Sequence, residues 1–409
     1  MTCPLPGWAE WQSTKPYSLG AEEEVMLLRP DDWSLAQEAD HVLPRLTAGL
    51  AAKVTGETHG AAVELGTGVH RRVSGVAGEL RDLRSSLQYE LDPFGLRVAS
   101  AGTHPFAVWQ QTVVSRSERY QAVYGSMRAL ARREPTFALH VHVGIADPEL
   151  AIRVANRLRA HLPLLLAVSV NSPFWQGRDT GLASARTPLF QAFPRVGIPR
   201  AFRDYDEWVS TVDLLIRCDA FPEPTFLWWD VRPQPRFGTV EVRIMDAQTT
   251  VTDSAALCAL IQCLAKLEAE EGHASELLVA SPEVLAENRF LAARDGMDAR
   301  LVDPVLERPV PARLWLEEIL AACVPHAREL GCEHELDDVR TLAGTTGTRR
   351  QLNRARDGDA TLERLVEGLA EAFLAESTSS SSRTASSSIT GSRLTSGSAA
   401  GSAYAAKCA

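Results

Sequence analysis

The sequence predicts an α+β fold built around an antiparallel sheet. Segments with the alternating polar and apolar pattern of half-buried strands occur in clumps, and they do not alternate strictly with the helical segments. The chain has 409 residues, of which 45% are hydrophobic and 23% are charged, so it is long enough to bury a large core. We expect helices on one face of the sheet and a cleft lined by polar side chains on the other.

Five segments alternate with period two, as strands do. They span residues 17–28, 95–101, 137–145, 226–231 and 238–245. Because successive side chains of a strand point to opposite faces, residues two apart in these segments share a face. Each segment is therefore expected to direct one row of side chains toward the helices and the other row away from them.

Helical periodicity is clearest over residues 74–91 and 115–133, where apolar residues recur at spacings of three and four. Asp147, Pro148 and Glu149 provide an N-cap, a proline at the first position and an acidic first turn for a helix that ends near residue 161. Asp253 is expected to cap a helix over 254–271 in the same way. Further helices are expected at 204–217, 313–330 and 361–375, and the chain after about Gly272 is predicted to be helical.

The remaining segments define the domain boundaries. Residues 1–16 are interpreted as an N-terminal extension and residues 17–376 as one catalytic-sized domain. Residues 171–203 have no steady period and contain four prolines and five arginines, which is typical of a functional or mobile segment. Residues 377–409 hold 12 Ser, 4 Thr and 3 Gly without an acidic residue, so we expect a disordered tail.

Charge and cysteine content exclude several classes of protein. The formal net charge is −10, and the tail contributes +3 of it, so the body carries −13. An acidic body argues against nucleic acid and anionic membranes as partners. The densest apolar stretch, residues 162–170, is too short to span a bilayer, and the N-terminus lacks the features of a secretory signal. Seven scattered cysteines without a C-x-x-C pair indicate reduced thiols in a cytoplasmic protein.

Three of the predicted strands carry unusual polar rows. Glu22 and Glu24 share a face of one strand, His140 and His142 share a face of another, and Glu241 and Arg243 share a face of a third. A fourth stretch, residues 55–65, adds Glu57 and Glu64. Carboxylates crowded in this way repel one another unless cations separate them, and oxygen ligands favour hard divalent ions such as Mg²⁺ bound to nucleotide phosphates.

Two other interpretations of these rows remain open. A half-exposed antiparallel sheet can simply carry charge on its solvent face, although repeated Glu and His are unusual there. His140 and His142 also match the H-x-H of zinc-dependent amidohydrolases, but residues 214–245 contain no further histidine for such a site. The phosphate-binding motifs G-x-x-x-x-G-K-[ST] and G-x-G-x-x-G are absent, so arginines and metal ions would have to bind phosphate.

Several motifs in the same order along the chain resemble the carboxylate-amine ligases of the glutamate-cysteine ligase type 2 group. The resemblance extends from about Tyr17 to Glu371. Its motifs are residues 19–24, 63–67, 101–106, 139–144, 171–181, 228–233, 238–243 and 287–290. It implies a glutamine-synthetase-like fold, in which a curved antiparallel sheet holds ATP and Mg²⁺, or Mn²⁺, on its concave face. The implied chemistry activates a carboxylate as an acyl phosphate and lets an amine displace the phosphate.

The resemblance also implies roles for individual residues. Arg243 is expected to contact the transferred phosphoryl group, Arg232 and Arg243 to bind the nucleotide, and Arg186 and Glu241 to take part in catalysis. His142 stands where the wider superfamily often has another polar residue. The expected metal ligands are Glu22, Glu24, Glu57, Glu64, His140 and Glu241.

The expected partners are a small-molecule carboxylate and an amine, with glutamate and cysteine as nominal substrates, and a homodimer is compatible with the sequence. Two rival functions remain. A guanidino-type phosphotransferase would share the sheet architecture and transfer phosphate without an amine acceptor. A catalytically silent protein would bind nucleotide or metal and act through its tail.

Overall fold

The computed structural model describes residues 5–133, 135–357 and 361–384. Its centre is a seven-stranded sheet with the order β10-β11-β5-β1-β3-β2, in which β4 also pairs with β1. All of these pairings are antiparallel, so the predicted sheet type is confirmed. The strands are β1 (Leu19–Leu28), β2 (Val54–Gly56), β3 (Ala62–Gly66), β4 (Arg97–Ala99), β5 (Ala138–Gly144), β10 (Val231–Gln234) and β11 (Thr239–Asp246).

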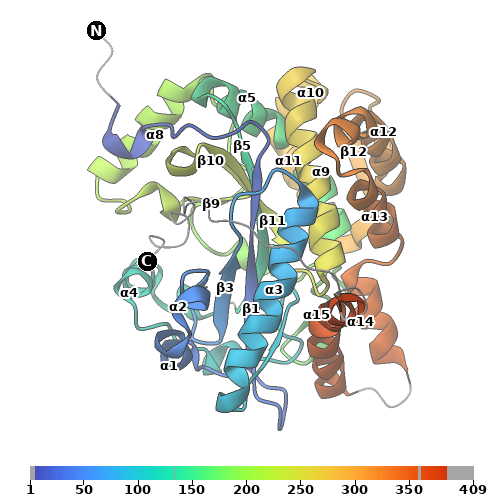
Figure 1. Cartoon of the computed structure of the whole chain (residues 1–409). Helices are drawn as coiled ribbons and strands as arrows, with labels where there is room; N and C mark the ends of the chain where they lie inside the picture. Colours follow the sequence, from blue (N-terminus) through green and yellow to red (C-terminus); the bar gives the residue numbers. More distant parts are fainter. Residues whose placement is uncertain (1–4, 134, 358–360, 385–409) are drawn as a thin grey trace, which may run out of the picture.

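One face of the sheet is apolar and packs against helices. Alternate side chains of β5 and β11, among them Val141 and Val242, are fully buried in the largest core cluster. The helices that contribute to this cluster include α3 (Val73–Leu91), α5 (Pro148–Leu158), α6 (Leu162–Ser169) and α9 (Val251–Glu270). Figure 1 shows α3 and α9 along one side of the sheet, with α4 (Glu118–Met127) and α8 (Tyr205–Arg217) on the opposite side. The period-two alternation therefore predicts the layers correctly.

Two boundary predictions are wrong for local reasons. Asp253 does not cap α9: Thr250 is the N-cap and its Oγ1 accepts a hydrogen bond from the Asp253 N–H at 3.2 Å, while the Asp253 carboxylate pairs with Arg350. The strand predicted at 226–231 is split into β9 (Trp228–Trp229) and β10. Pro233 lies inside β10, which is tolerated because β10 is at the edge of the sheet and needs no donor on its outer side.

The predicted irregular segment 171–203 contains only short elements: β6 (Phe174–Trp175), β7 (Arg178–Asp179), α7 (Arg186–Phe190) and β8 (Val196–Gly197). Two short helices, α1 (Ala39–Val42) and α2 (Ala48–Ala51), lie between β1 and β2. The sequence pattern did not predict α6, because its side chains are apolar all round and show no helical period.

The chain after Gly272 is mainly helical, as expected, with one hairpin between β12 (Arg300–Asp303) and β13 (Arg308–Pro311). The last helix, α15 (Leu362–Thr384), includes the first eight residues of the predicted tail, and residues 385–409 lie outside the described residues. The other helices are α10 (Glu276–Val279), α11 (Pro282–Asp295), α12 (Ala312–Leu330), α13 (Glu333–Gly344) and α14 (Gly347–Arg356).

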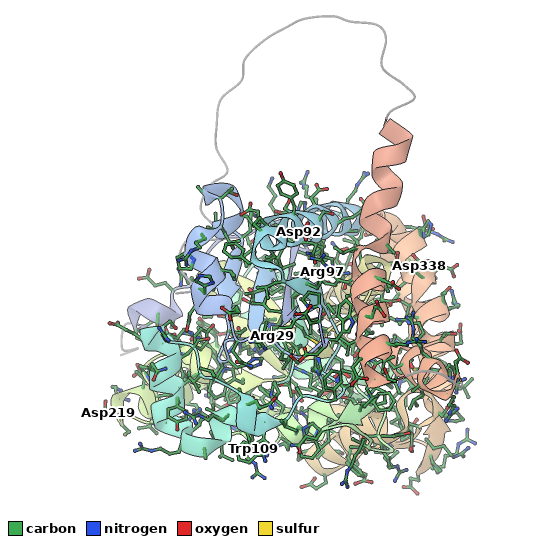
Figure 2. All side chains as sticks on the ribbon, turned by 90° about the horizontal axis from the view of Figure 1, so that it is seen from below. Arg29, Asp92, Arg97, Trp109, Asp219 and Asp338 are labelled. Carbon is green, nitrogen blue, oxygen red and sulfur yellow. The ribbon has the colours of Figure 1, made fainter. Side chains whose placement is uncertain are left out.

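Charged side chains cover the outer surface, as the view from below shows (Figure 2). One ion pair there joins Arg97 of β4 to Asp92, with 2.8 Å between Nη1 and Oδ1. The five cysteines within the described residues are free thiols, as predicted. Over that same part of the chain, no helix has the length and hydrophobicity needed to cross a membrane.

The loop after β4 is held by a buried histidine in one fixed tautomer. His104 is 1% exposed, and its Nε2–H donates to the Trp33 carbonyl oxygen at 2.8 Å. Its Nδ1 accepts the N–H groups of Phe106 at 3.3 Å and Ala107 at 3.0 Å. Burial lowers the pKa of His104 to about 4. The neutral ring is therefore part of the native structure.

This arrangement predicts a loss of stability at mildly acidic pH. The unfolded chain takes up a proton on His104 near pH 6.5, whereas the folded protein does not until about pH 4, so the contribution is complete above pH 6.5 and is lost as the pH falls toward 4. Between pH 7 and 5, wild type should lose about 1–2 kcal/mol more unfolding free energy than His104→Gln. Urea titrations of both proteins measure the difference, and equal losses would contradict it.

Candidate active site

A cavity of about 440 Å³ opens on the polar face of the sheet. Side chains of β1, β3, β5 and β11 form its inner wall, and α4, α7, the segment before β10 and the N-terminal turn form its outer wall. Its volume lies in the range of small-molecule sites. All the site residues predicted from the sequence line it: Glu22, Glu24, Glu57, Glu64, His140, Arg186, Arg232, Glu241 and Arg243.

Strand register brings the acidic residues of this cavity together. The Cα partner of Glu22 on β5 is His140, and that of Glu24 on β3 is Glu64. Opposite residues of an antiparallel pair project from the same face, so these four side chains converge. Glu57 follows directly after β2. Because β2 pairs with β3, Glu57 lies near Glu64 of β3.

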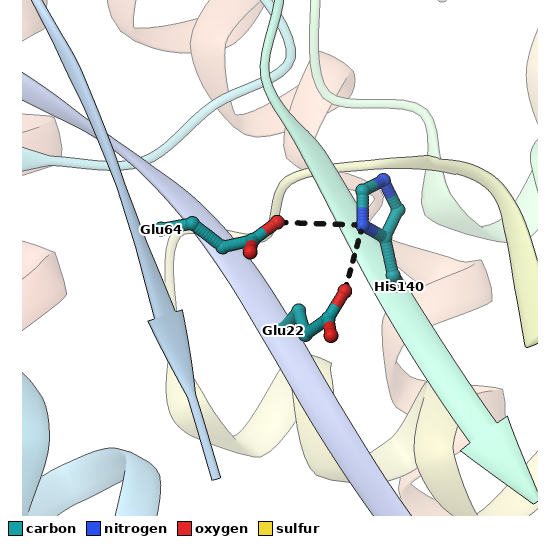
Figure 3. Close-up of side chains that lie close together, drawn as sticks. All are labelled: Glu22, Glu64 and His140. Carbon is teal, nitrogen blue, oxygen red and sulfur yellow. Dashed lines mark hydrogen bonds and ion pairs between the residues drawn. The ribbon is translucent and has the colours of Figure 1, made fainter. Parts of the chain in front are cut away.

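Within the part of the chain that the structure describes, three groups of side chains have ligand atoms close enough to share a metal ion. Within each group, the ligand atoms lie within 4.8 Å of one another. His140 Nδ1 lies 3.4 Å from Glu22 Oε2 and 3.7 Å from Glu64 Oε2 (Figure 3). The groups are Glu22, Glu64 and His140; Glu22, His142 and Glu241; and Glu24, Glu57 and Glu64.

Three of the carboxylates at one end of the cavity, those of Glu24, Glu57 and Glu64, lie close together. Burial and the neighbouring Glu57 carboxylate raise the pKa of Glu24 to about 8. Burial together with the other carboxylates raises the pKa of Glu64 well above its ordinary value, and burial raises that of Glu57. A divalent cation would remove this repulsion, and carboxylate oxygens are ligands that Mg²⁺ and Mn²⁺ accept. The side chains present therefore fit the expected metal ions.

The two histidines differ in their surroundings. Burial and the nearby Arg243 guanidinium lower the pKa of His140 to about 4, so its ring is neutral. Burial would also lower the pKa of His142, but Glu22 and Glu241 outweigh this effect and raise it. His142 Nε2 has no hydrogen-bond partner among the described residues and lies 3.5 Å from Glu22 Oε1 and 3.9 Å from Glu241 Oε1. His142 is thus oriented toward the acidic cluster.

Arg243 lies at an irregularity in β11. The register between β11 and β5 shifts between Val242 and Met245, which is the signature of a β-bulge. The Arg243 side chain remains on the cavity side, where Nη1 donates to Glu241 Oε1 and lies 3.3 Å from His140 Nδ1. Burial would lower the pKa of Arg243, but Glu241 raises it, so the guanidinium is a permanent positive charge among the acids.

Arg232 makes four hydrogen bonds within the protein. Its Nε and Nη2 donate to the two carboxylate oxygens of Glu241, at 2.6 and 3.2 Å, and Nη1 donates to the carbonyls of Thr225 and Leu227 at 3.0 and 2.5 Å. Gln234, two residues further along the same strand, donates to Glu241 Oε2 at 2.8 Å. In this geometry Arg232 holds Glu241 in place while it also lines the cavity, and its contact with a nucleotide stays a prediction.

Arg186 is buried beside the bulge. Its Nη1 donates to the Ile244 carbonyl at 3.0 Å and its Nη2 to the Arg243 carbonyl at 3.4 Å. A bulge disrupts the ladder locally, and here a side chain supplies donors to the carbonyls of two bulge residues. Arg186 therefore contacts the backbone that carries Arg243 while also lining the cavity.

A single carboxylate anchors the irregular segment that follows α6. Asp246, at the end of β11, accepts hydrogen bonds from the Asn171 N–H at 2.8 Å, the Ser172 hydroxyl at 2.7 Å and the Ser184 hydroxyl at 2.9 Å. Asp246 is completely buried, as are Ser172 and Ser184. This Asp246 junction ties residues 171–184 to the strand that bears Glu241 and Arg243.

Sequence patterns gave no signal for several residues of the cavity. Tyr120 of α4 donates through its hydroxyl to the Gly56 carbonyl at 2.5 Å, next to Glu57. Burial and Glu57 raise its pKa well above the ordinary value. Gln234 and Trp8 also line the cavity. The positions of these residues depend on how segments far apart in sequence pack together, and a local sequence pattern does not indicate that packing.

Comparison with known proteins identifies the family. The model of the family described as Glutamate-cysteine ligase family 2 (GCS2) matches residues 18–368, which is most of the chain. The chain belongs to glutamate-cysteine ligase family 2. Membership of this family confirms the resemblance stated from the motifs and places the chain among carbon–nitrogen ligases.

Named members of the family match along most of their length. A protein of Rubrobacter xylanophilus named "Putative glutamate--cysteine ligase 2-1" is 39% identical over 367 residues, which cover 88% of this chain and 96% of the relative. A protein of Sorangium cellulosum named "Putative glutamate--cysteine ligase 2" is 37% identical over 348 residues, covering 83% and 92%. The family assignment therefore rests on nearly the whole chain.

Solved structures of two ligases share the fold of this family member. A bifunctional glutathione synthetase from Pasteurella multocida superposes with a TM-score of 0.66 at 13% identity, over 88% of this chain and 52% of that one. A glutamate–cysteine ligase from Francisella tularensis, solved in complex with AMP, gives a TM-score of 0.62 at 12% identity, over 93% and 97%. The predicted α+β, glutamine-synthetase-like fold is confirmed.

Proposed function

We propose that the protein is an ATP-dependent carboxylate-amine ligase that forms an amide bond through an acyl phosphate. The observation that carries the proposal is the single cavity surface on which the three metal-ligand groups lie beside Arg243. The family match supports the ligase class, and the AMP complex of the Francisella tularensis ligase supports the use of a nucleotide. Glutamate and cysteine are the nominal substrates, in line with the names of the relatives.

In the proposed mechanism, Mg²⁺ or Mn²⁺ held by the six acidic and histidine ligands would neutralise the phosphate oxygens of ATP. Glu241 keeps its orientation because Arg232 and Gln234 bind its carboxylate from the neighbouring strand. Arg243 donates to the phosphoryl group as negative charge spreads over its oxygens, so no protein nucleophile is needed. Arg186 fixes the backbone of Arg243 at the bulge.

The second half of the reaction needs an amine and the exclusion of water. The substrate carboxylate attacks the terminal phosphorus, ADP leaves, and the amine then displaces phosphate from the acyl carbon and loses one proton. Side chains of α4, α7 and the segment before β10 cover the cavity, which limits access of water to the acyl phosphate. The carboxylates of Glu22, Glu24, Glu57, Glu64 and Glu241 line the same cavity. Their negative charge favours the binding of a positively charged group.

The decisive experiment screens carboxylates and amines with ATP and Mg²⁺ and measures ADP release. The ligase proposal expects release only when an acid and an amine are both present. ADP release with a single phosphate acceptor would instead support the guanidino-type phosphotransferase. Nucleotide binding without any ADP release would support the catalytically silent binding protein.

The metal preference gives a separate prediction. Oxygen ligands dominate the cluster, so Mg²⁺ or Mn²⁺ should restore nucleotide binding to chelator-treated protein, and Zn²⁺ should not. Elemental analysis of the purified protein and calorimetry with each metal measure this. Stoichiometric zinc that is required for activity would contradict the proposal. It would support the alternative that the protein is a zinc-dependent amidohydrolase with His140 and His142 as ligands.

A further inference from the structure

Residues 7–12, named here the N-terminal wall, form one side of the cavity. Gly7, Trp8, Glu10 and Gln12 line it directly. The wall precedes residue 18, where the match to the family model begins. The sequence pattern predicts that these residues form an extension, yet four of them line the same cavity as the acidic side chains.

Hydrogen bonds from three different elements hold the backbone of the N-terminal wall. The Tyr205 hydroxyl donates to the Ala9 carbonyl at 2.7 Å, and the Gln12 N–H donates to the Pro235 carbonyl at 2.9 Å. Trp11 Nε1 donates to the Ile145 carbonyl at 3.0 Å. Figure 1 shows this N-terminal turn, in blue, beside α8. The wall is therefore built into the fold.

Two glycines at the same end of the sheet make room for this part of the chain. A Cβ on Gly238, whose φ is +63°, would lie 2.1 Å from the Gln12 carbonyl oxygen. A Cβ on Gly144 would lie 2.5 Å from the carbonyl oxygen of Lys15. Contacts this short exclude any side chain at either position. The ends of β5 and β11 are thus shaped to receive the N-terminal segment.

Trp8 gives the wall an apolar surface. Its ring packs edge-on against Trp208, with 5.6 Å between centroids, and Trp208 stacks on Tyr205 at 5.5 Å. Trp8 belongs to the same apolar cluster as Val123, Met127, Phe193 and Trp228, all of which also line the cavity. The cavity therefore has two chemically different parts, an apolar rim formed by these five side chains and an acidic, metal-ligating floor.

We propose that Trp8 is a specificity-determining residue: the apolar rim binds a planar or hydrocarbon group of a small molecule whose charged end reaches the acidic floor. The base of a nucleotide is such a planar group, and the hydrocarbon part of a carboxylate or amine substrate is such a hydrocarbon group. The inference rests on the proposed function for the identity of these molecules. Aromatic contacts of this kind contribute enough to affect binding measurably.

The test compares Trp8→Ala, Trp8→Phe and a control, Trp229→Ala, which removes a tryptophan of the same apolar cluster that does not line the cavity. Calorimetry measures the Kd of ATP with Mg²⁺, of AMP, and of glutamate and cysteine, and steady-state assays give KM and kcat. Melting temperatures confirm that each variant is folded. Trp8→Phe retains an aromatic ring beside Trp208 and so provides the test if Trp8→Ala does not fold.

We expect Trp8→Ala to raise the Kd and KM of one ligand by about 3- to 10-fold with kcat nearly unchanged, Trp8→Phe to restore part of the affinity, and the control to match wild type. A shift for ATP and AMP assigns the rim to the base, and a shift for glutamate or cysteine assigns it to the substrate. Unchanged constants in a folded Trp8 variant overturn the inference. Wild type that binds these ligands but releases no ADP overturns only the proposed function, and wild type that binds none overturns both.

Discussion

Arg243→Ala should lower the rate of amine-dependent ADP release by roughly 10²-fold or more, the scale expected for removing one preorganised donor to a transition state. The affinity for ATP should change far less, because the charge on the phosphoryl group is greatest during transfer. Arg243→Lys should restore little activity, since an ammonium group cannot reproduce the forked geometry of a guanidinium. Turnover and ATP affinity, measured together for wild type and both variants, test this prediction.

A structural role for Arg243 would give a different result. Its Nη1 pairs with Glu241 and contacts His140, so a purely structural arginine would, when removed, disturb both side chains. Binding and turnover would then fall by the same factor. Arg97→Ala is a suitable control because Arg97 belongs to the same sheet but pairs with Asp92 on the surface. It should behave like wild type in both measurements.

Glu24→Gln and Glu241→Gln should differ in their effects on stability, although both remove an expected metal ligand. Glu24 lies in a group with Glu57 and Glu64, so its amide variant relieves repulsion and can still accept the Ala138 N–H, which lies 2.7 Å from Oε2. The metal-free Glu24→Gln protein should melt at the same or a higher temperature. Its affinity for ATP with Mg²⁺ should nevertheless fall by about 100-fold, because even residues behind a metal ligand cost 10- to 100-fold when altered.

Glu241→Gln should destabilise the protein before any ligand is added. The carboxylate accepts two hydrogen bonds from Arg232, and both side chains are buried. An amide would leave the Arg232 charge without its counterion, and breaking a buried pair in this way costs about 3–5 kcal/mol. Urea unfolding and calorimetry of the two variants, with and without Mg²⁺, give the comparison. Equal stabilities for both variants would contradict the charge distribution described here.

The polar face of the sheet could be predicted from the sequence because it depends on alternation alone. Residues two apart on a strand share a face whatever the twist of the strand, as Glu22 and Glu24 do. The order of the strands in the sheet determines only which of these side chains become neighbours. Glu23 shows where the pattern fails. It points to the apolar face, where Arg84 of α3 pairs with it at 2.8 Å and Ser254 donates to it. The sequence distance between Glu23 and Arg84 hides this pairing.

Roles that depend on tertiary packing could not be predicted. The nucleotide-binding role of Arg232 stays a prediction, but the pairing of β10 with β11 places it opposite Glu241, and no local pattern indicates its contact with that carboxylate. The role of Arg186 in catalysis also stays a prediction, and its contacts with the bulge carbonyls depend on the position of α7 beside β11. The position of the N-terminal wall also depends on tertiary packing. Tyr205 and Pro235, which bind its backbone, are more than 190 residues away in sequence.

The Asp246 junction has a consequence for amide hydrogen exchange in the segment that it anchors. The amide proton of Asn171 ends on a buried carboxylate, so it can exchange with solvent only when that hydrogen bond opens. Ser172 and Ser184 bind the same carboxylate through their hydroxyls, so both ends of the segment are held to one buried acceptor. The Asn171 amide is therefore expected to exchange as slowly as the core of the sheet, whereas the exposed residues Gly177, Arg178 and Asp179 between these two ends are expected to exchange faster.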